Sequence, residues 1–273
     1  MNEALSLNTQ VILTPLNGGL HRETELVDVL VRIQSPDAPA GTLSERPPQA
    51  LSLVLDRSGS MSGRPLAEAR RCVEYVVGRL RPTDIVGLVV FDNRITELHP
   101  PQSVGDGDAI RAAIAQVVEG GATNLHGGWR HGADALVALP GIALRRVILL
   151  SDGKANAGPT KIDEIAPQCA ELAAAGVTTS TCGLGEHFHE DLMVEMARAG
   201  RGNSYYGDTA EDLMDPFVQE LDLLGNLCLS DLRLSVTVPE GVTATMLNDL
   251  QFSDGTWRLP DLAWGAEAWP SSG

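Results

Sequence analysis

Residues 51 to 62 read Leu51-Ser-Leu-Val-Leu-Asp56-Arg-Ser58-Gly-Ser60-Met-Ser62, an apolar run that ends in one carboxylate followed by two hydroxyls at alternate positions. A short apolar run bounded by polar residues is typical of a strand covered on both faces, as in a parallel sheet. Asp56 then lies at the carboxyl end of that strand, the edge at which open α/β sheets bind ligands. The stretch therefore predicts a buried strand followed by a polar loop.

The loop contains the first candidate metal ligands, Asp56, Ser58 and Ser60. Alternate residues of a loop can turn three oxygens toward one point, and Mg²⁺, Mn²⁺ and Ca²⁺ prefer such hard oxygen donors. Serine is also common in turns and helix caps, so both serines have an ordinary structural explanation as well. The triplet alone does not decide between a metal site and a simple turn.

The composition is that of a globular protein with an acidic surface. The chain has 273 residues, of which 43% are hydrophobic, enough for one large α/β domain and something smaller. Thirty-six acidic and 20 basic residues give a formal charge of −16. This balance argues against nucleic acid or an anionic membrane as the main partner. It favours a cation or a basic surface, or simply reflects a solvated exterior.

The cysteines and the N-terminus indicate a cytoplasmic location. The cysteines are far apart and form no metal-ligand spacing, which favours reduced, mostly buried thiols. The first residues have no basic region before an apolar core, and no run of about 18 apolar residues occurs anywhere. We expect neither a signal peptide nor a membrane span in these residues. The cysteines are Cys72, Cys169, Cys182 and Cys228.

Residues 49–225 alternate between strand and helix patterns. Repeated strand, crossover and helix predicts an α/β domain with a doubly wound, mostly parallel, Rossmann-like sheet and right-handed crossovers. We expect strands at 51–55, 85–91, 95–98, 146–150 and 177–182, and helices at 64–80, 108–118, 125–139, 162–175 and 210–224.

The flanks, 1–46 and 227–273, are β-rich. Apolar and polar residues alternate from Val27 to Ile33 and again from Leu232 to Val238, with a turn at Asn17-Gly-Gly19. A Pro-rich connector follows residue 35 and marks a boundary. We expect the flanks to pack together as one small β-sandwich. Trp264 and Trp269 stand close to the last residue, as expected if both pack or if the C-terminal flank is truncated.

Two further polar loops are predicted at the same sheet edge as Asp56. Gly120-Gly-Ala-Thr123-Asn124 is a flexible loop that ends in a good helix N-cap. Residues 146–150 form a second buried strand that ends in Ser151-Asp152-Gly153, which repeats the pattern of a carboxylate directly after an apolar run.

These three loops together resemble the von Willebrand factor type A family. The similarity is carried by Asp56-Arg-Ser58-Gly-Ser60, by Gly120-Gly-Ala-Thr123 and by Leu149-Leu-Ser-Asp152-Gly, and it extends over about residues 49 to 225. The resemblance implies a metal-ion-dependent adhesion site in which Ser58, Ser60 and Thr123 offer hydroxyls and Asp56 and Asp152 offer carboxylates, some of them through water.

The resemblance also implies a ligand and a class of function. The family binds Mg²⁺ or Mn²⁺ and completes the coordination with a carboxylate of its protein ligand; Ca²⁺ is less expected. Two carboxylates neutralise a divalent ion only formally, and Mg²⁺ keeps a coordination position that an incoming Asp or Glu can take. Binding rather than catalysis follows. Bacterial relatives often work beside MoxR-type ATPases or in stress-response complexes, which is an analogy of family.

Two enzyme classes are alternatives. A haloacid-dehalogenase-like phosphatase would use Asp56 as its nucleophile, but the acid/base Asp two positions later is replaced by Ser58, which does not protonate a leaving alcohol. A hydrolase with Ser60, Asp152 and His187 or His189 would need Gly-x-Ser-x-Gly around its serine, and neither Ser58 nor Ser60 has it.

Several other residues have both an ordinary and a functional explanation. His187 and His189 form a possible ligand cluster, although alternate histidines in a loop before a helix favour a solvated surface. His126 and His131 either line a helix face or tune a partner contact. We expect four residues next to the metal loops to frame the partner surface. These are Arg57, Met61, Trp129 and Lys154.

Overall fold

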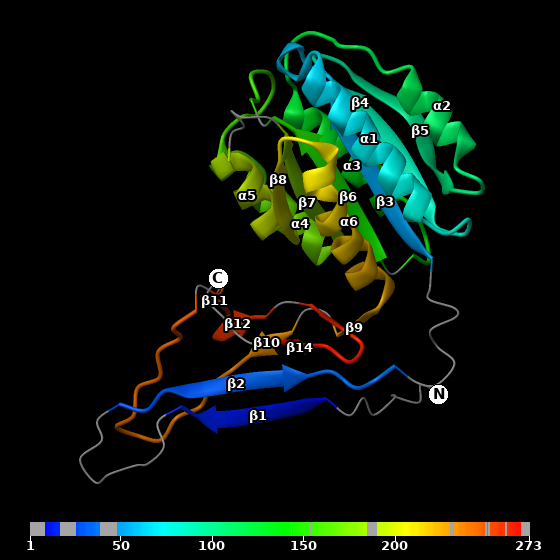
Figure 1. Ribbon diagram of the computed structural model, residues 1–273. Coiled ribbons are helices and arrows are strands. Elements are labelled where there is room, and N and C mark those ends of the chain that lie inside the picture. The colour runs from blue at the N-terminus through cyan, green and yellow to red at the C-terminus, as the bar shows by residue number, and fades with distance from the viewer. Residues whose placement is uncertain are drawn as a thin grey trace. The chain divides into compact units, whose positions relative to one another are not determined.

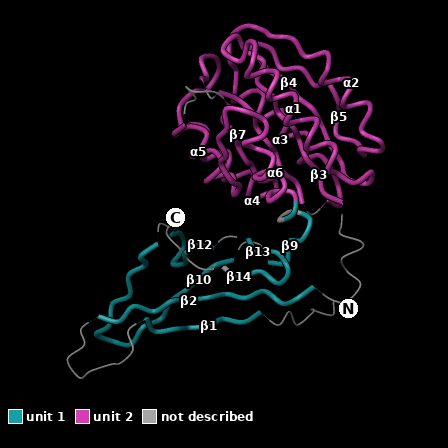
Figure 2. Tube along the Cα trace, in the orientation of Figure 1, with its two compact units in different colours: residues 1–46, 222–273 teal, residues 47–221 magenta. Residues whose placement is uncertain are grey.

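The computed structural model describes residues 9–16, 26–38, 48–142, 144–152, 154–184, 190–229, 232–248, 250, 252–259 and 261–268. The chain forms two compact units, residues 47–221 and residues 1–46 together with 222–273 (Figure 2). The predicted turn at Asn17-Gly-Gly19 lies outside the described residues, as do Gly153, His187 and His189.

The larger unit contains a six-stranded sheet in the order β5-β4-β3-β6-β7-β8 (Figure 1). Neighbouring strands are parallel except for β5, which runs antiparallel to β4 at one edge. This confirms the predicted doubly wound, mostly parallel sheet. The strands are β3 (Gln49–Asp56), β4 (Ile85–Phe91), β5 (Ile95–Ser103), β6 (Leu144–Ser151), β7 (Val177–Leu184) and β8 (Arg201–Gly207).

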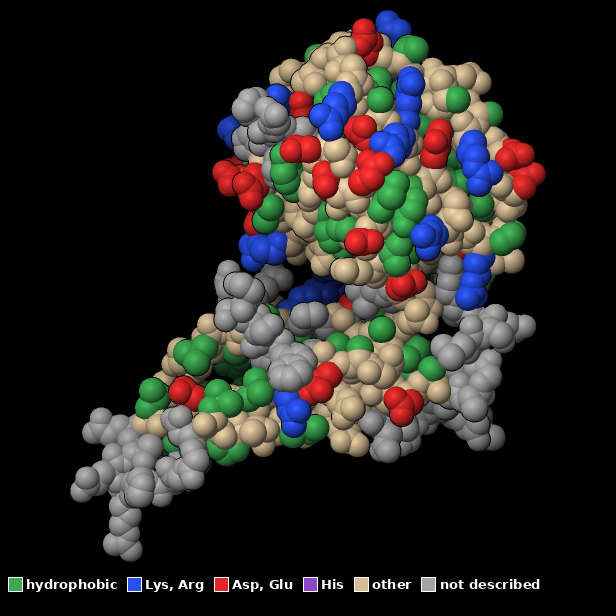
Figure 3. Space-filling model, in the orientation of Figure 1, with side chains coloured by type: hydrophobic (Ala, Val, Ile, Leu, Met, Phe, Trp, Pro, Cys, Tyr) green, Lys and Arg blue, Asp and Glu red, His purple; other side chains and the backbone are tan. Residues whose placement is uncertain are grey.

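Helices cover both faces of the sheet, with α3, α4 and α5 on one face and α1 and α6 on the other (Figure 1). Acidic and basic side chains are interspersed over the α1 side rather than gathered by sign (Figure 3). The helices are α1 (Arg64–Arg79), α2 (Asp108–Ala115), α3 (Leu125–Val137), α4 (Ile162–Ala174), α5 (Glu190–Ala199) and α6 (Ala210–Gly225). None of the described helices is both long enough and apolar enough to cross a membrane.

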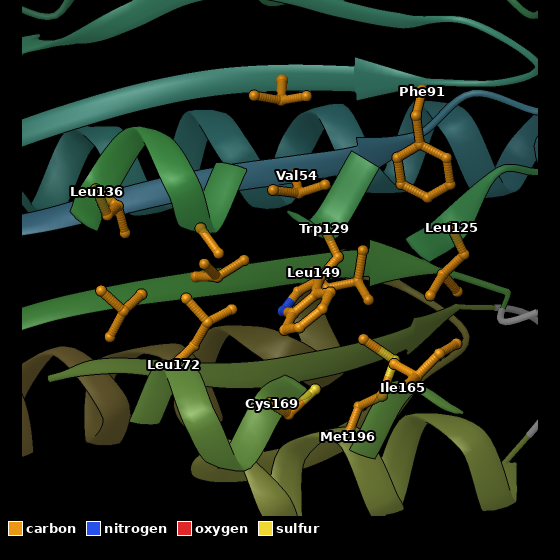
Figure 4. Close-up of a cluster of buried hydrophobic side chains, with 14 of the residues drawn as sticks. Val54, Phe91, Leu125, Trp129, Leu136, Leu149, Ile165, Cys169, Leu172 and Met196 are labelled. Carbon is orange, nitrogen blue, oxygen red and sulfur yellow. The ribbon is translucent and has the colours of Figure 1, made fainter. Parts of the chain in front are cut away.

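Every residue of β3 is buried, as its continuous apolar run predicts. On one face, Val54 packs with Phe91, Leu149 and Trp129 beneath α3 (Figure 4). Trp129 is fully buried and donates its indole N–H to Thr179 Oγ1 at 3.0 Å. Close packing of α3 on β3 requires Gly132, because a Cβ there would lie 2.5 Å from Val54 Cγ2. The edge from which the polar loops leave is therefore fixed by a dense core.

The strand predictions for the larger unit were incomplete in two places. Strand β5 continues to Ser103 rather than ending near residue 98, and β8 was not predicted at all. Strand β8 is an edge strand with mostly polar, partly exposed residues, so it lacks the apolar run that identified the other strands. The four cysteines are free thiols as expected, three of them buried and Cys228 half-buried.

The smaller unit is built from short antiparallel sheets. Strand β2 (Val29–Gln34) pairs with β1 (Gln10–Pro15) and with β14 (Glu267–Ala268), so both flanks contribute to one sheet. Ile33 packs in a small core with Leu259 and Leu262. The remaining short strands are β9 (Leu227–Leu229), β10 (Arg233–Leu234), β11 (Phe252–Ser253), β12 (Thr256–Arg258) and β13 (Leu262–Ala263).

The alternating patterns of the flanks overestimated both the strands and their burial. The strand predicted from Leu232 to Val238 is reduced to β10, because β10 pairs with the three-residue strand β12 and the ladder ends there. Val29 is 47% exposed, since its partner is Pro15 at the end of the β1 ladder, whereas Ile33 lies in the small core. A single sandwich of both flanks stays a prediction.

Candidate metal centre

Asp56, Ser58 and Ser60 lie together directly after β3. Asp56 is fully buried, and its Oδ1 accepts the Ser58 backbone N–H at 2.8 Å. A short 3₁₀ turn at Gly59–Met61 then reverses the chain, and it places the Oγ atoms of Ser58 and Ser60 3.2 Å apart. Ser58 is buried and Ser60 is exposed, so the hydroxyl pair leads from the core to the surface.

Backbone hydrogen bonds hold the threonine loop against this turn. Gly120 donates to the Arg57 carbonyl at 2.7 Å, and Gly59 donates to the Gly121 carbonyl at 2.9 Å. Gly120 has no room for a side chain, because a Cβ would lie 1.9 Å from Asp92 Oδ2. Gly120 is therefore required for the close approach of the threonine loop to Asp92, a reason that flexibility alone does not supply.

Thr123 is fixed from the other side by the loop after β6. Its N–H donates to Asn156 Oδ1 at 2.8 Å, and its carbonyl accepts the N–H groups of Asn156 and Ala157 at 3.1 Å. Thr123 is buried, and α3 begins two residues later at Leu125, as predicted. The Asn124 side chain caps that helix by accepting the Gly127 N–H at 3.0 Å.

Asp152 brings the third loop to the same place. It follows β6 directly and is 4% exposed, and its Oδ1 accepts the Lys154 N–H at 3.2 Å. Its Oδ2 is buried and accepts no hydrogen bond from any residue that the structure describes, with Lys154 Nζ 3.6 Å away. A buried carboxylate oxygen without a hydrogen bond is costly unless a cation neutralises it.

The electrostatics of the two carboxylates favour a bound cation. Burial, with a smaller contribution from the charge of Asp152, raises the pKa of Asp56 to about 6, although hydrogen bonds from Ser151 and Ser58 lower it. Two buried acids that repel one another, beside hydroxyl oxygens, are a donor set that suits a hard divalent ion. No group of three His, Cys, Asp or Glu side chains that could hold a metal occurs in the described part of the chain. The serine and threonine hydroxyls are therefore needed to complete a site.

Sequence reasoning missed three residues that support this edge. Ser151 donates to Asp56 Oδ2 at 2.6 Å, Asn156 holds Thr123, and Asp92 forms an ion pair with Arg57 at 3.2 Å. Asp92 had a usable signal, because it directly follows the apolar strand β4 just as Asp56 follows β3. The contacts of Ser151 and Asn156 depend on loop geometry that no short motif encodes.

Two of the four residues expected to frame a partner surface do not reach it. Met61 and Trp129 are fully buried, because both side chains complete the core beneath the loops. Arg57 is engaged by Asp92, whereas the Lys154 side chain is 47% exposed. His126 contacts Gln168, and His131 lies 3.4 Å from Glu97, so both line helix α3.

The chain is similar to proteins from distant organisms. It is 27% identical over 227 residues to the uncharacterized protein sll0103 of Synechocystis, a match that covers 81% of this chain and 53% of the relative. The chain thus spans about half the length of this relative.

Two solved structures have the same fold. A von Willebrand factor type A protein from Catenulispora acidiphila superposes with a TM-score of 0.67 at 15% identity, over 88% of this chain and 58% of that one. Proximal thread matrix protein 1 from the mussel byssus, with a zinc-occupied MIDAS motif, has a TM-score of 0.53 at 19% identity, over 64% of this chain and 46% of that one.

The model of the von Willebrand factor type A domain matches residues 51–219, which is more than half of the sequence. Its match includes β3, the threonine loop and the end of β6, the segments that form the candidate centre. The domains of this family are generally non-catalytic, metal-dependent binding modules, and this chain belongs to the von Willebrand factor type A domain family.

Proposed function

We propose that residues 49–225 form a metal-dependent protein-binding module. Asp56, Ser58, Ser60, Thr123 and Asp152 would hold Mg²⁺ or Mn²⁺, and an Asp or Glu of a partner protein would complete the coordination. The observation that carries this proposal is the buried Oδ2 of Asp152, which accepts no hydrogen bond from the described residues and lies beside a second buried carboxylate. A cation at this point offsets both unfavourable charges.

The five residues divide into two roles. Both oxygens of Asp56 already accept hydrogen bonds, from Ser58 and Ser151, so this carboxylate suits contact through water. Asp152 has one oxygen that accepts no hydrogen bond from the described residues, and Ser58, Ser60 and Thr123 carry neutral hydroxyls, so these four suit direct coordination. A divalent ion bound here would supply the positive charge that an acidic ligand requires.

The same contacts argue against the phosphatase alternative. A nucleophilic Asp56 would need an accessible oxygen in line with a phosphoryl group. Asp56 is instead fully buried, with one oxygen bonded to the backbone of Ser58 and the other to Ser151. Release of a generic phosphate ester by the metal-loaded protein would contradict the proposal, and we expect none.

The proposed partner class rests on the family resemblance, and the proposed compartment rests on the free thiols. The mussel protein with the same fold holds zinc at its MIDAS motif, which supports a divalent ion without choosing between Mg²⁺ and Mn²⁺. Free, buried cysteines favour a reducing compartment, and we expect the protein to work in the cytoplasm. A MoxR-type ATPase or a stress-response complex is the first partner class to test, by resemblance to bacterial relatives.

Titration calorimetry with Mg²⁺ and Mn²⁺ tests the metal site. We expect one site in the wild type, lost in Asp152→Ala and Asp56→Ala, with folding retained because each change removes a buried charge and leaves the apolar core side chains in place. Asp108→Ala is a matched control, since Asp108 is a 78% exposed acid that forms an ion pair with Arg111 on α2. Unchanged affinity in both site variants would contradict the metal centre.

The ligand part of the proposal needs a second measurement. Candidate partners should bind in Mg²⁺ and dissociate in chelator, and binding should require one acidic residue of the partner. Thr123→Ala should weaken partner binding more than metal loading, because a neutral hydroxyl leaves the charge balance intact; we expect a loss of about 1 to 3 kcal/mol. Equal partner affinity in chelator would show an ordinary, metal-independent interface.

A further inference from the structure

Lys154 is an exposed cation beside the candidate centre. Its backbone N–H donates to Asp152 Oδ1 at 3.2 Å, and its Nζ lies 3.6 Å from Asp152 Oδ2. This is the oxygen that accepts no hydrogen bond from the described residues and that a divalent ion would use. The ammonium group of Lys154 and a metal ion would therefore compete for the same carboxylate oxygen.

Arg57, which follows Asp56 in the first metal loop, is already neutralised. Arg57 Nη2 lies 3.2 Å from Asp92 Oδ2, and Asp92 is 4% exposed. The Arg57–Asp92 pair thus contributes no net charge to the edge, whereas the Lys154 side chain is 47% exposed and its carboxylate partner is a proposed metal ligand. Lys154 therefore contributes a positive charge that Arg57 does not.

We infer that Lys154 couples the two binding steps of the site with opposite sign: it opposes metal loading and favours capture of a carboxylate. This inference rests on the proposed function. In the metal-free state the ammonium partly neutralises Asp152, so a divalent ion must displace it or tolerate its repulsion. Once a divalent ion balances Asp56 and Asp152, Lys154 leaves the site with one extra positive charge, which attracts an anionic ligand.

The overall charge makes such a residue useful. The chain has a formal net charge of −16, which repels acidic ligands at long range. Only two of its 20 basic residues are lysines, Lys154 and Lys161. A flexible lysine suits this role better than an arginine, because its compact charge does not lock onto a carboxylate in two-pronged geometry.

The test uses the whole chain and two probes, Mn²⁺ alone and acetate. Mn²⁺ affinity is measured by calorimetry on chelator-treated protein. Acetate affinity is measured on Mn²⁺-saturated protein through water-proton relaxation, which falls as acetate displaces metal-bound water. For Lys154→Met we expect Mn²⁺ to bind about two- to fivefold more tightly and acetate about two- to fivefold more weakly, the range of a partly exposed charge pair. Both effects should shrink in high salt.

The chain offers a matched control, Lys161→Met. Lys161 is 71% exposed and lies 3.8 Å from Glu164 at the start of α4, so its loss removes the same charge away from the centre. Both affinities should stay at the wild-type values in Lys161→Met. Lys154→Arg keeps the charge, so it should bind Mn²⁺ no more tightly, and acetate no more weakly, than the wild type does.

The opposite changes in Mn²⁺ affinity and acetate affinity distinguish the proposed coupling from a distorted loop. A distorted loop would weaken Mn²⁺ and acetate together, and this outcome would overturn the inference, as would no change in either or a change in only one. Failure of the proposed function has a different signature. In that case the wild type and Asp152→Ala would bind Mn²⁺ equally poorly, before any lysine variant is compared.

Discussion

Ser151 donates a 2.6 Å hydrogen bond to Oδ2 of Asp56, although the two residues lie 95 positions apart and end different strands. Because β3 and β6 are parallel neighbours, their carboxyl ends meet, and a hydroxyl on one strand reaches the carboxylate of the other. This bond favours the charged form of Asp56, against the effect of burial on its pKa.

Ser151→Ala should weaken metal binding although Ser151 is not a proposed ligand. Without this donor the pKa of Asp56 rises further, so a larger fraction is protonated near neutral pH. We expect Mg²⁺ affinity to fall about tenfold near pH 6 and less near pH 8, the scale of one hydrogen bond to a charged group. Ser103→Ala, at the exposed end of β5, is the control. An equal loss at both pH values would indicate a packing effect instead.

The raised pKa of Asp56 also predicts how the metal-free protein responds to pH. The folded pKa is about 6 and the ordinary value is 3.8, so the folded state binds the proton more tightly than the unfolded state. The contribution of Asp56 to stability is therefore unfavourable above pH 6 and improves as pH falls through 6 toward 3.8. With metal bound, the contribution of Asp56 to stability should instead be favourable at high pH and decrease as the pH falls, because the metal stabilises the charged carboxylate.

Thermal unfolding with and without Mg²⁺ across this range measures the effect. The increase in Tm caused by Mg²⁺ should be largest above pH 7 and much smaller near pH 5, about one unit below the Asp56 pKa, where most of this carboxyl is protonated. Asp56→Asn should remove the pH dependence that belongs to this group. A Tm increase that is constant across the range would show that Asp56 does not titrate with this pKa.

The sequence predicted the sheet and the candidate residues because each has a local signature. The fully buried run of β3 and the carboxylate after it are visible in twelve residues, and the same pattern marks Asp152. Strand β8 and Asn156 have no such signature. Strand β8 is defined by pairing with β7, and Asn156 matters because it contacts Thr123 across two loops. Met61 and Trp129 were misplaced because their neighbours in sequence are polar loops, whereas their neighbours in space are core residues.

Gly120→Ala should damage the metal centre. The added Cβ would lie 1.9 Å from Asp92 Oδ2, so the buried Asp92 side chain must leave its ion pair with Arg57, or the threonine loop must shift and weaken the bond from Gly120 to Arg57. We expect a loss of about 1–3 kcal/mol in unfolding free energy and a large loss of metal affinity. Gly78→Ala is the control: it lies in α1 with nothing within 4 Å, and should gain about 0.5–1 kcal/mol. A neutral Gly120→Ala would show that the loop is not fixed by close contact.

Glu220 should be a major determinant of stability away from the centre. It is buried on α6 beside Arg146, and it accepts bonds from Asn203 and Tyr205 at 2.8 Å each. Burial alone would raise its pKa, but the charge of Arg146 and the hydrogen bonds hold the pKa of Glu220 below its ordinary value. Glu220→Ala leaves Arg146 buried without its partner and should cost about 3–5 kcal/mol in urea unfolding.

An exposed acid on the same helix is the control. Glu211 lies in the first turn of α6, is 57% exposed and pairs with Arg71, so Glu211→Ala should cost less than about 1 kcal/mol. The double variant Glu220→Ala with Arg146→Met should recover part of the loss, since it removes both charges. No recovery would mean that the hydrogen bonds of Glu220, rather than its ion pair, carry the effect.

The last prediction concerns the two flanks, which we propose form one β unit around the inserted α/β domain. Ser35 donates to the Ala263 carbonyl at 2.6 Å, β2 pairs with β14, and Ile33 packs on Leu259 and Leu262. Without residues 227–273, the fragment 1–225 loses these contacts and exposes both Ile33 and an edge of β2. Short unpaired sheets of this kind are unstable and prone to aggregate.

The fragment 49–225 keeps the six-stranded sheet. We therefore expect 49–225 to stay monomeric, to resist protease and to bind Mg²⁺ like the whole chain, while 1–225 scatters light and loses its first 46 residues to protease. Equal solubility and equal protease resistance of the two fragments would mean that the N-terminal flank does not depend on the C-terminal one.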